Sequence, residues 1–117
     1  MKRFNRAGTL LVALGGLVVG CATPRAVGFD PAGVEGPTRA AVQLGAGNVP
    51  DAAVYLSFSH DEVERARRLS NAGDEERARA MLSRAGADAE LALAITKRSI
   101  AEKEAVQAMQ LKHPEAP

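Results

Sequence analysis

The sequence predicts an all-α protein: an alanine-rich antiparallel helical hairpin with a long second helix, after a cleaved signal peptide and a flexible tether. Three observations lead to this fold class. An uncharged apolar run near the N-terminus ends at the only cysteine, and a stretch rich in Pro and Gly follows it. Apolar residues then recur every three or four positions, as on one face of a helix. The expected organisation is a signal peptide at 1–20, a linker at 21–37, a helical domain at 38–112 and a disordered tail at 113–117.

The N-terminal segment has the proportions of a secretory signal. Lys2, Arg3 and Arg6 are its only charged residues, and residues 7–19 carry no charge at all. A positively charged start followed by an apolar run of this length is typical of exported proteins. The run is too short to cross a membrane, because a helix needs roughly 20 apolar residues to span a hydrocarbon core. We therefore expect this segment to be removed after export.

The residues before the cysteine indicate how the signal ends. Residues 17–21 read Leu-Val-Val-Gly-Cys, which resembles the lipobox of bacterial lipoproteins. The resemblance implies that a peptidase cuts between Gly20 and Cys21 and that the Cys21 thiol carries a diacylglycerol. A disulfide within the chain is excluded because there is no second cysteine. A buried core cysteine is the plain alternative, and a catalytic thiol would need a nearby His that this region lacks.

A lipid on Cys21 makes the membrane the first predicted partner. Two or three acyl chains hold a protein on a bilayer stably, whereas one gives only marginal binding. The protein is then anchored to the cell envelope without spanning it. In Gram-negative lipoproteins an Asp after the cysteine retains the protein at the inner membrane, so the resemblance, with Ala22 at that position, favours the outer membrane facing the periplasm.

Composition argues against nucleic acid as a partner. Removal of residues 1–20 takes away three of the 15 Lys and Arg and none of the 14 Asp and Glu. The remaining 12 cations against 14 acids leave a weakly acidic chain with no basic stripe. The sequence has one Tyr, three Phe and no Trp, so the core is expected to be thin and made mostly of alanine.

The segment after the cysteine is expected to begin as a tether. Residues 22–37 contain three Pro and three Gly, a density that breaks helices and strands, and a flexible chain of that length reaches about 20 to 25 Å. Residues 38–45 could form two helical turns before the next Gly- and Pro-rich stretch. Residues 51–56 could add a further turn or two, with Pro50 at the first helical position, where Pro is favoured.

The two arms of the hairpin follow. Ser59 and Glu62 have the spacing of a capping box, which predicts a first helix from Ser59 to Ser70. Gly73 is expected to end it in a left-handed conformation, and Asp74 to cap the next helix. That second helix runs to about Leu111 without a Pro, over roughly 57 Å. Glu75 with Arg79, and Arg98 with Glu102, are expected to pair on its wet side.

The mismatch between the arms defines the candidate interaction surface. The first helix can cover the second only as far as about Glu90, which leaves an apolar stripe without a partner: Leu91, Ile95, Val106 and Met109. Either residues 38–56 fold back over this stripe, or another helix binds it. That helix would come from an envelope protein or from a second copy of the chain. The sequence leaves these possibilities open.

The alanine pattern resembles a known family. The matching residues are Ala66-x-x-Leu69, Ala72-Gly73-Asp74-x-x-x-Ala78-Arg79 and Ala85-x-x-Asp88-Ala89-x-Leu91-Ala92. They look like the small bacterial envelope domains catalogued as domain of unknown function 4398, over about residues 52–104. The resemblance implies an alanine-rich helical hairpin, commonly part of a short lipoprotein. The family has no established activity, so it implies no mechanism.

No motif in the sequence indicates catalysis. His60 lies beside acidic residues that the helix dipole explains, and His113 lies in the tail, without further His or Cys at metal-ligand spacing. We therefore expect no catalytic residue, no metal and no cofactor. The predicted function is a non-catalytic structural or adaptor module. The alternatives are a tetratricopeptide-like binding fragment, for which we find no 34-residue repeat, and a small envelope enzyme with an unrecognised site.

Overall fold

The computed structural model describes residues 28–112, and in this part of the chain every regular element is helical. The elements are α1 (Ala32–Gln43), a 3₁₀ turn η1 (Ala46–Asn48), α2 (Pro50–Asn71) and α3 (Glu75–Lys112). The all-α prediction is confirmed. The expected signal peptide, the cleavage site at Gly20 and Cys21, and the tail at 113–117 lie outside the described residues.

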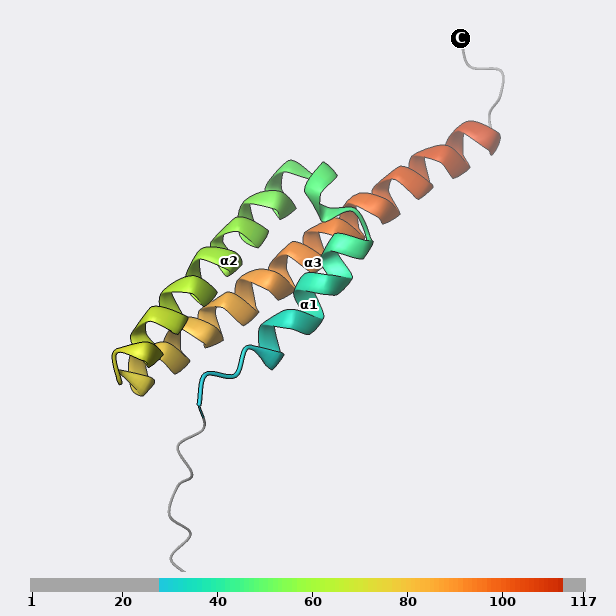
Figure 1. Ribbon diagram of the computed structural model, residues 1–117. Coiled ribbons are helices and arrows are strands. Elements are labelled where there is room, and N and C mark those ends of the chain that lie inside the picture. The colour runs from blue at the N-terminus through green and yellow to red at the C-terminus, as the bar shows by residue number, and fades with distance from the viewer. Residues whose placement is uncertain (1–27, 113–117) are drawn as a thin grey trace, which may run out of the picture.

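The helices pack around α3, which is longer than either of the others (Figure 1). Helices α2 and α3 form the expected antiparallel hairpin, and α1 lies against α3 in the parallel direction. Both α1 and α2 pack extensively on α3 but barely touch each other. The C-terminal end of α3 runs on past the end of the bundle, so the second arm outruns the first as predicted.

The turn between the arms has the expected capping geometry. Gly73 has φ of 81°, a conformation that costs L side chains energy and that glycine adopts freely. The Asp74 N–H donates back to the Leu69 carbonyl at 2.9 Å, which closes the end of α2. The Asp74 carboxylate then accepts a bond from the Arg77 N–H at 3.2 Å at the start of α3. Both predictions for this turn are confirmed.

The interface between α2 and α3 is built from small residues seven positions apart. Ala52, Ser59 and Ala66 are buried on α2, and on α3 the buried residues at the same spacing are Ala78, Ala85 and Ala92. A seven-residue repeat keeps one seam of each helix facing the other along a left-handed pair. Eight of the nine buried apolar residues in the described chain are alanine, so the helices pack through their backbones rather than through large side chains.

The structure corrects the predicted start of the first arm. Helix α2 begins at Pro50, the position favoured for Pro, and continues through Ser59 to Asn71. Ser59 is therefore not a capping residue. It is buried in the helix interior, where its hydroxyl donates a 2.8 Å hydrogen bond to the Ala85 carbonyl of α3. Ser59 and Glu62 thus have the spacing of a capping box without forming one. Position 59 instead holds a small polar residue that fits the interface with α3.

The structure also corrects the predicted linker. Residues 32–37 belong to α1, which contains Pro37 and two glycines within the helix. Helix α1 is held by packing: Val34 clusters with Ala85 and Ala89 of α3, and Ala41 with Ala92. This burial outweighs the poor helix propensity of the segment. The predicted end of this helix before the next Gly- and Pro-rich stretch is confirmed, since Gly45 is left-handed with φ of 83°.

The α3 stripe is covered over only part of its length. The ends of α1 and η1 and the start of α2 pack against Ala92, with Leu93 and Ile95 lying over the same cluster. Beyond this point residues 101–112 are all exposed. The other elements therefore cover α3 up to about residue 100, and its final turns extend past the bundle.

Candidate interaction surface

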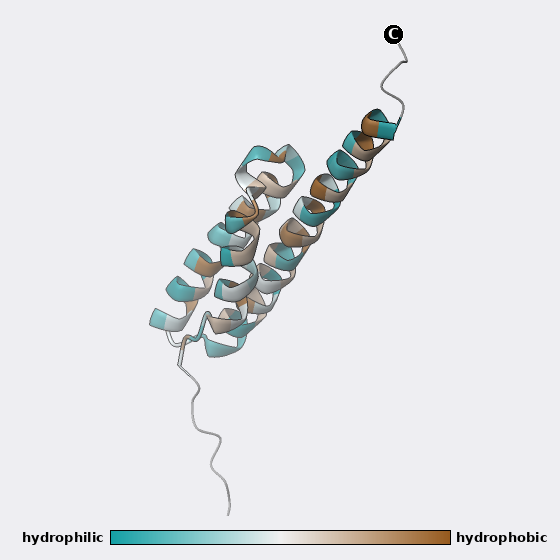
Figure 2. Ribbon diagram, turned by 90° about the vertical axis from the view of Figure 1, so that its right-hand side faces the viewer, coloured by the Kyte–Doolittle hydropathy of each residue, from teal (hydrophilic) through white to brown (hydrophobic). Residues whose placement is uncertain are grey.

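The four residues predicted as an interaction surface lie on one side of α3. At about 100° per residue, Leu91, Ile95, Val106 and Met109 fall within an arc of about 60°. Val106 is 53% exposed and Met109 68% exposed, whereas Leu91 is partly covered and Ile95 is half-buried. Figure 2 shows apolar segments recurring along the free end of α3. The structure therefore places these residues together, as a stripe that begins on the bundle and continues beyond it.

Three residues of α2 widen this stripe where it crosses the bundle. Val54 and Phe58 are about half exposed, and the Tyr55 ring meets the Phe58 ring edge to face at 6.1 Å. Together with Asp51 and Ile95 they line a hollow of about 420 Å³. This flank was not predicted, because residues 51–56 and the helix from Ser59 were expected to be separate elements. The spacing of 54, 55 and 58 on one continuous helix is the signal that could have found it.

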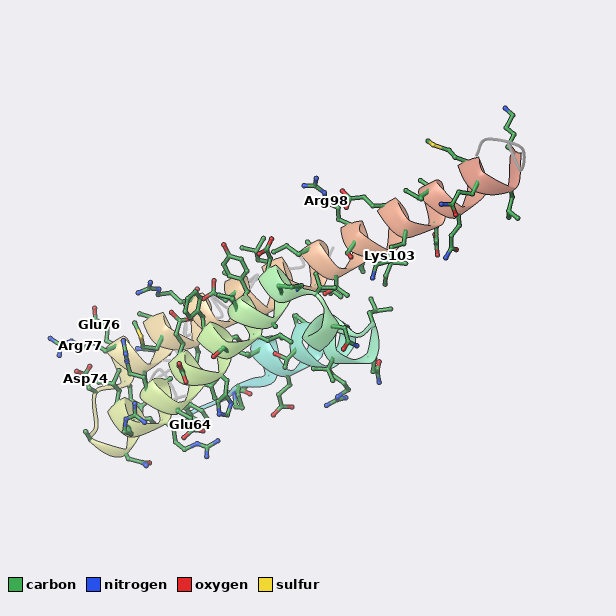
Figure 3. The ribbon with its side chains drawn as sticks, turned by 90° about the horizontal axis from the view of Figure 1, so that it is seen from above. Glu64, Asp74, Glu76, Arg77, Arg98 and Lys103 are labelled. Atoms are coloured by element: carbon green, nitrogen blue, oxygen red, sulfur yellow. The ribbon has the colours of Figure 1, made fainter. Side chains whose placement is uncertain are left out.

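Two charged residues lie in the middle of the same stripe. Arg98 and Glu102 fall within about 20° of the line from Leu91 to Met109, and the Arg98 guanidinium donates to the Glu102 carboxylate at 2.7 Å. That hydrogen bond, followed by the charge of Glu102, raises the pKa of Arg98. Figure 3 shows Arg98 pointing away from α1, while Lys103 points to another side of α3. The expected pair therefore forms, and it divides the apolar stripe into two halves.

Glu75 and Arg79, the other two residues expected to pair along α3, do not form the predicted contact. Glu75 instead accepts a hydrogen bond from the Ser70 hydroxyl at 2.7 Å, across the turn between α2 and α3. This bond ties the last turn of one arm to the first turn of the other. Glu75 thus strengthens the hairpin connection rather than the outer face of α3.

A separate groove runs between α1 and α2, because both helices pack on α3 and leave a gap between themselves. Its volume is about 410 Å³, and its apolar lining comes from Val34, Val42, Leu56 and Val63. His60 and Arg67 lie on its α2 side. The Arg67 guanidinium stacks over the Phe29 ring at 5.5 Å and so joins the chain before α1 to α2. The groove lies on the side of the bundle where α1 packs, away from the stripe.

A buried carboxylate is the one unusual polar group between α2 and α3. The Glu62 side chain is 13% exposed, and it pairs with the more exposed Arg84 at 3.2 Å. Its second oxygen is buried and has no hydrogen-bond partner within residues 28–112. Burial, and next the negative charge of Asp88, raise the pKa of Glu62. Protonation would let Glu62 donate a hydrogen bond to a neighbouring acceptor, so we expect the stability of this cluster to depend on pH.

The described residues offer no group of metal ligands. Among residues 28–112, no three His, Cys, Asp or Glu side chains lie close enough together to hold a metal ion. In the same part of the chain no helix combines the length and the apolar character that a membrane span requires.

Comparison of the chain with protein-family models, with curated proteins and with solved structures finds no match. The expected resemblance to the envelope family stays a prediction. Inference about function therefore depends on the chain's own residues, above all on the stripe along α3.

Proposed function

We propose that the protein is a lipid-anchored, non-catalytic interaction module of the bacterial cell envelope. The lipobox-like residues before Cys21 support the anchor, and Ala22 favours the outer membrane facing the periplasm. The observation that carries the interaction role is the stripe from Leu91 to Met109, which continues past the bundle on the free end of α3.

The free end of α3 has the properties of a binding element. Residues 101–112 form three turns of helix with no covering partner within the described chain. A helix segment of this length is marginal in water, and most helical stability in proteins comes from packing of an apolar face. Val106 and Met109 present such a face on the part of α3 that extends past the bundle. A helix laid along it would gain burial and would stabilise the extension.

The position of the anchor suits this role. Cys21 lies ten positions before Pro31, the residue that precedes α1, and an extended chain of ten residues spans at most about 36 Å. The bundle is then held within a few tens of ångströms of the membrane. The partner in this proposal is a helical protein of the same compartment or a second copy of the chain.

The anchor is tested by metabolic labelling with a fatty acid. The wild-type chain should be labelled, and Cys21→Ser should abolish the label while the uncut precursor accumulates. Labelling of the Cys21→Ser chain would show that the lipid is attached elsewhere or that the lipobox reading is wrong.

The interaction surface is tested by photo-crosslinking in cells. A photoreactive residue replaces Val106 in one variant and Val42 in another. These two valines are similarly exposed, at 53% and 59%, but Val42 lies on α1 beside the groove. Protein crosslinks should form from position 106 and be absent from position 42. Equal crosslinking from both positions, or none from 106, would contradict the proposed surface.

A further inference from the structure

The stripe on α3 is self-complementary when a second copy of the helix lies antiparallel to it. An antiparallel pair centred at the height of residue 100 places Leu91 opposite the Met109 of the second copy. The same alignment places Ile95 opposite position 105, one residue and about 1.5 Å along the helix from Val106. Each apolar residue on the bundle thus lies opposite or beside an apolar residue on the other copy's free end. Because the contact is two-fold symmetric, both free ends are covered at once and the assembly closes as a dimer.

The charged centre of the stripe fits the same alignment. Arg98 of one copy lies opposite Glu102 of the other, and the reverse pair forms on the far side of the symmetry axis. Both side chains are mostly exposed in the single chain, so they are free to turn toward a second helix. A guanidinium has five N–H donors, so each Arg98 can keep the 2.7 Å bond to its own Glu102 and donate to the second copy as well. A parallel pair would instead place like charges side by side.

Val54, Tyr55 and Phe58 form the α2 flank of the stripe, and the second copy can pack against this flank. The hollow formed by Val54, Tyr55 and Phe58 also includes Ile95, the residue that lies within one position of Val106 of the second copy. Met109 of that copy lies further along, where its polarizable sulfur is suited to contact aromatic rings. Helix α1 does not obstruct this approach. Gly86, whose surroundings include Gly33 of α1, lies about 140° around α3 from Leu91 and Met109 on the helical wheel.

We infer that the chain forms an antiparallel homodimer through α3, in which the free end of each copy covers the stripe and the α2 flank of the other. This inference rests on the interaction surface of the proposed function and names its partner. The arrangement buries residues that the single chain leaves exposed, and its central Arg98 and Glu102 pairs select both the partner and the direction of the helix.

Disulfide cross-linking in the envelope tests the alignment with the full chain. Cys21 is the only cysteine of the natural chain, so cross-linking of the wild-type chain gives the background that Cys21 produces. The variant carrying both Leu91→Cys and Met109→Cys should form a covalent dimer under oxidising conditions. Each single variant should remain monomeric, because identical positions would lie about 27 Å apart along the antiparallel pair, far beyond disulfide distance. Variant levels are matched to wild type by immunoblot.

A charge exchange in the double-cysteine chain tests the centre of the contact. Arg98→Glu should lower the cross-linked fraction roughly tenfold, because both symmetric pairs become repulsive. Adding Glu102→Arg should restore cross-linking, and Val42→Glu at the distant groove should leave it unchanged. Helical content, measured by circular dichroism on the purified chains, should be the same in all four.

Two results would overturn the dimer. Cross-linking by either single cysteine variant would indicate a parallel or shifted pair. A double variant that reaches wild-type levels but does not cross-link would exclude the alignment. If the photoreactive residue at 106 then captures a different protein, the interaction surface stands and only its partner has been misidentified. Absence of both kinds of crosslink would contradict the proposed function too.

Discussion

The Ser59 hydroxyl of α2 donates a 2.8 Å hydrogen bond to the backbone carbonyl of Ala85 on α3. Both residues are buried, and each lies seven positions from an alanine on either side within its own helix. A side-chain hydroxyl can reach the backbone of a neighbouring helix only when the two helices are very close. This bond therefore indicates that α2 and α3 pack closely along the alanine seam.

Substitutions at Ser59 should separate the hydrogen bond from the packing. Ser59→Ala removes the bond and leaves the seam intact, so it should lower the free energy of unfolding by about 1 kcal/mol. Ser59→Leu forces a large side chain into the seam and should cost about 3 kcal/mol or more. Urea denaturation followed by circular dichroism measures both. A Leu variant as stable as the Ala variant would show that the helices are not closely packed here.

The turn glycine is expected to resist a branched side chain. Gly73 has φ of 81°, so Gly73→Val should destabilise the hairpin by about 1 kcal/mol or more. Gly86 is the matched control, because it lies within α3 and an added Cβ would meet only ordinary contact at 3.5 Å. Gly86→Ala should therefore be neutral or stabilising. Thermal melting of both variants checks the contrast, and equal destabilisation at the two glycines would contradict it.

The stability of the hairpin should depend on pH through Glu62. The pKa of Glu62 is raised above its ordinary value of 4.5, first by burial and then by Asp88. The folded state therefore holds the proton more tightly than the unfolded state. The stabilisation is fully present below the unfolded pKa and is lost as pH rises through the folded pKa. Charged groups facing Glu62 include Arg84 and Arg65, which act in the opposite direction.

Glu62→Gln isolates this effect, because Gln imitates the neutral acid. The variant and the wild type should have similar stability below about pH 4.5. The variant should gain relative stability as pH rises above that value, until the wild-type carboxyl is fully ionised. Denaturation at a series of pH values gives the difference between the two proteins. A constant difference across the series would mean that the pKa of Glu62 is not shifted.

The free end of α3 should carry the association of the chain without contributing to the fold of the bundle. Val106→Glu places a carboxylate on the stripe, where burial in an interface is costly, so association should fall by tenfold or more. Val42→Glu makes the same change at a similarly exposed valine of α1 and should leave association unchanged. Sedimentation of the chain without residues 1–21 measures both, after circular dichroism has verified its helicity. Equal loss of association in both variants would argue against the stripe.

Local signals in the sequence were sufficient to predict the hairpin. The absence of Pro between Asp74 and Leu111 predicts one long helix. The adjacent Gly73 and Asp74 predict the turn, because a left-handed glycine and an N-cap are formed by contacts within a few residues. The stripe from Leu91 to Met109 was predictable for the same reason. Residues on one face of a helix follow from periodicity alone once the helix is known.

Contacts distant in sequence decided the rest. Residues 32–37 were predicted to be a linker from their Pro and Gly content. In the structure Val34 and Ala41 are buried against α3, and this packing holds the segment in a helix. Ser59 was predicted to be a helix cap from its spacing to Glu62, but its hydroxyl donates to the backbone carbonyl of Ala85, a residue 26 positions away. The α2 flank of the stripe depends on the register between two helices. Propensity and spacing describe a few consecutive residues, whereas burial against another helix contributes more free energy than these local preferences and is set only by the tertiary fold.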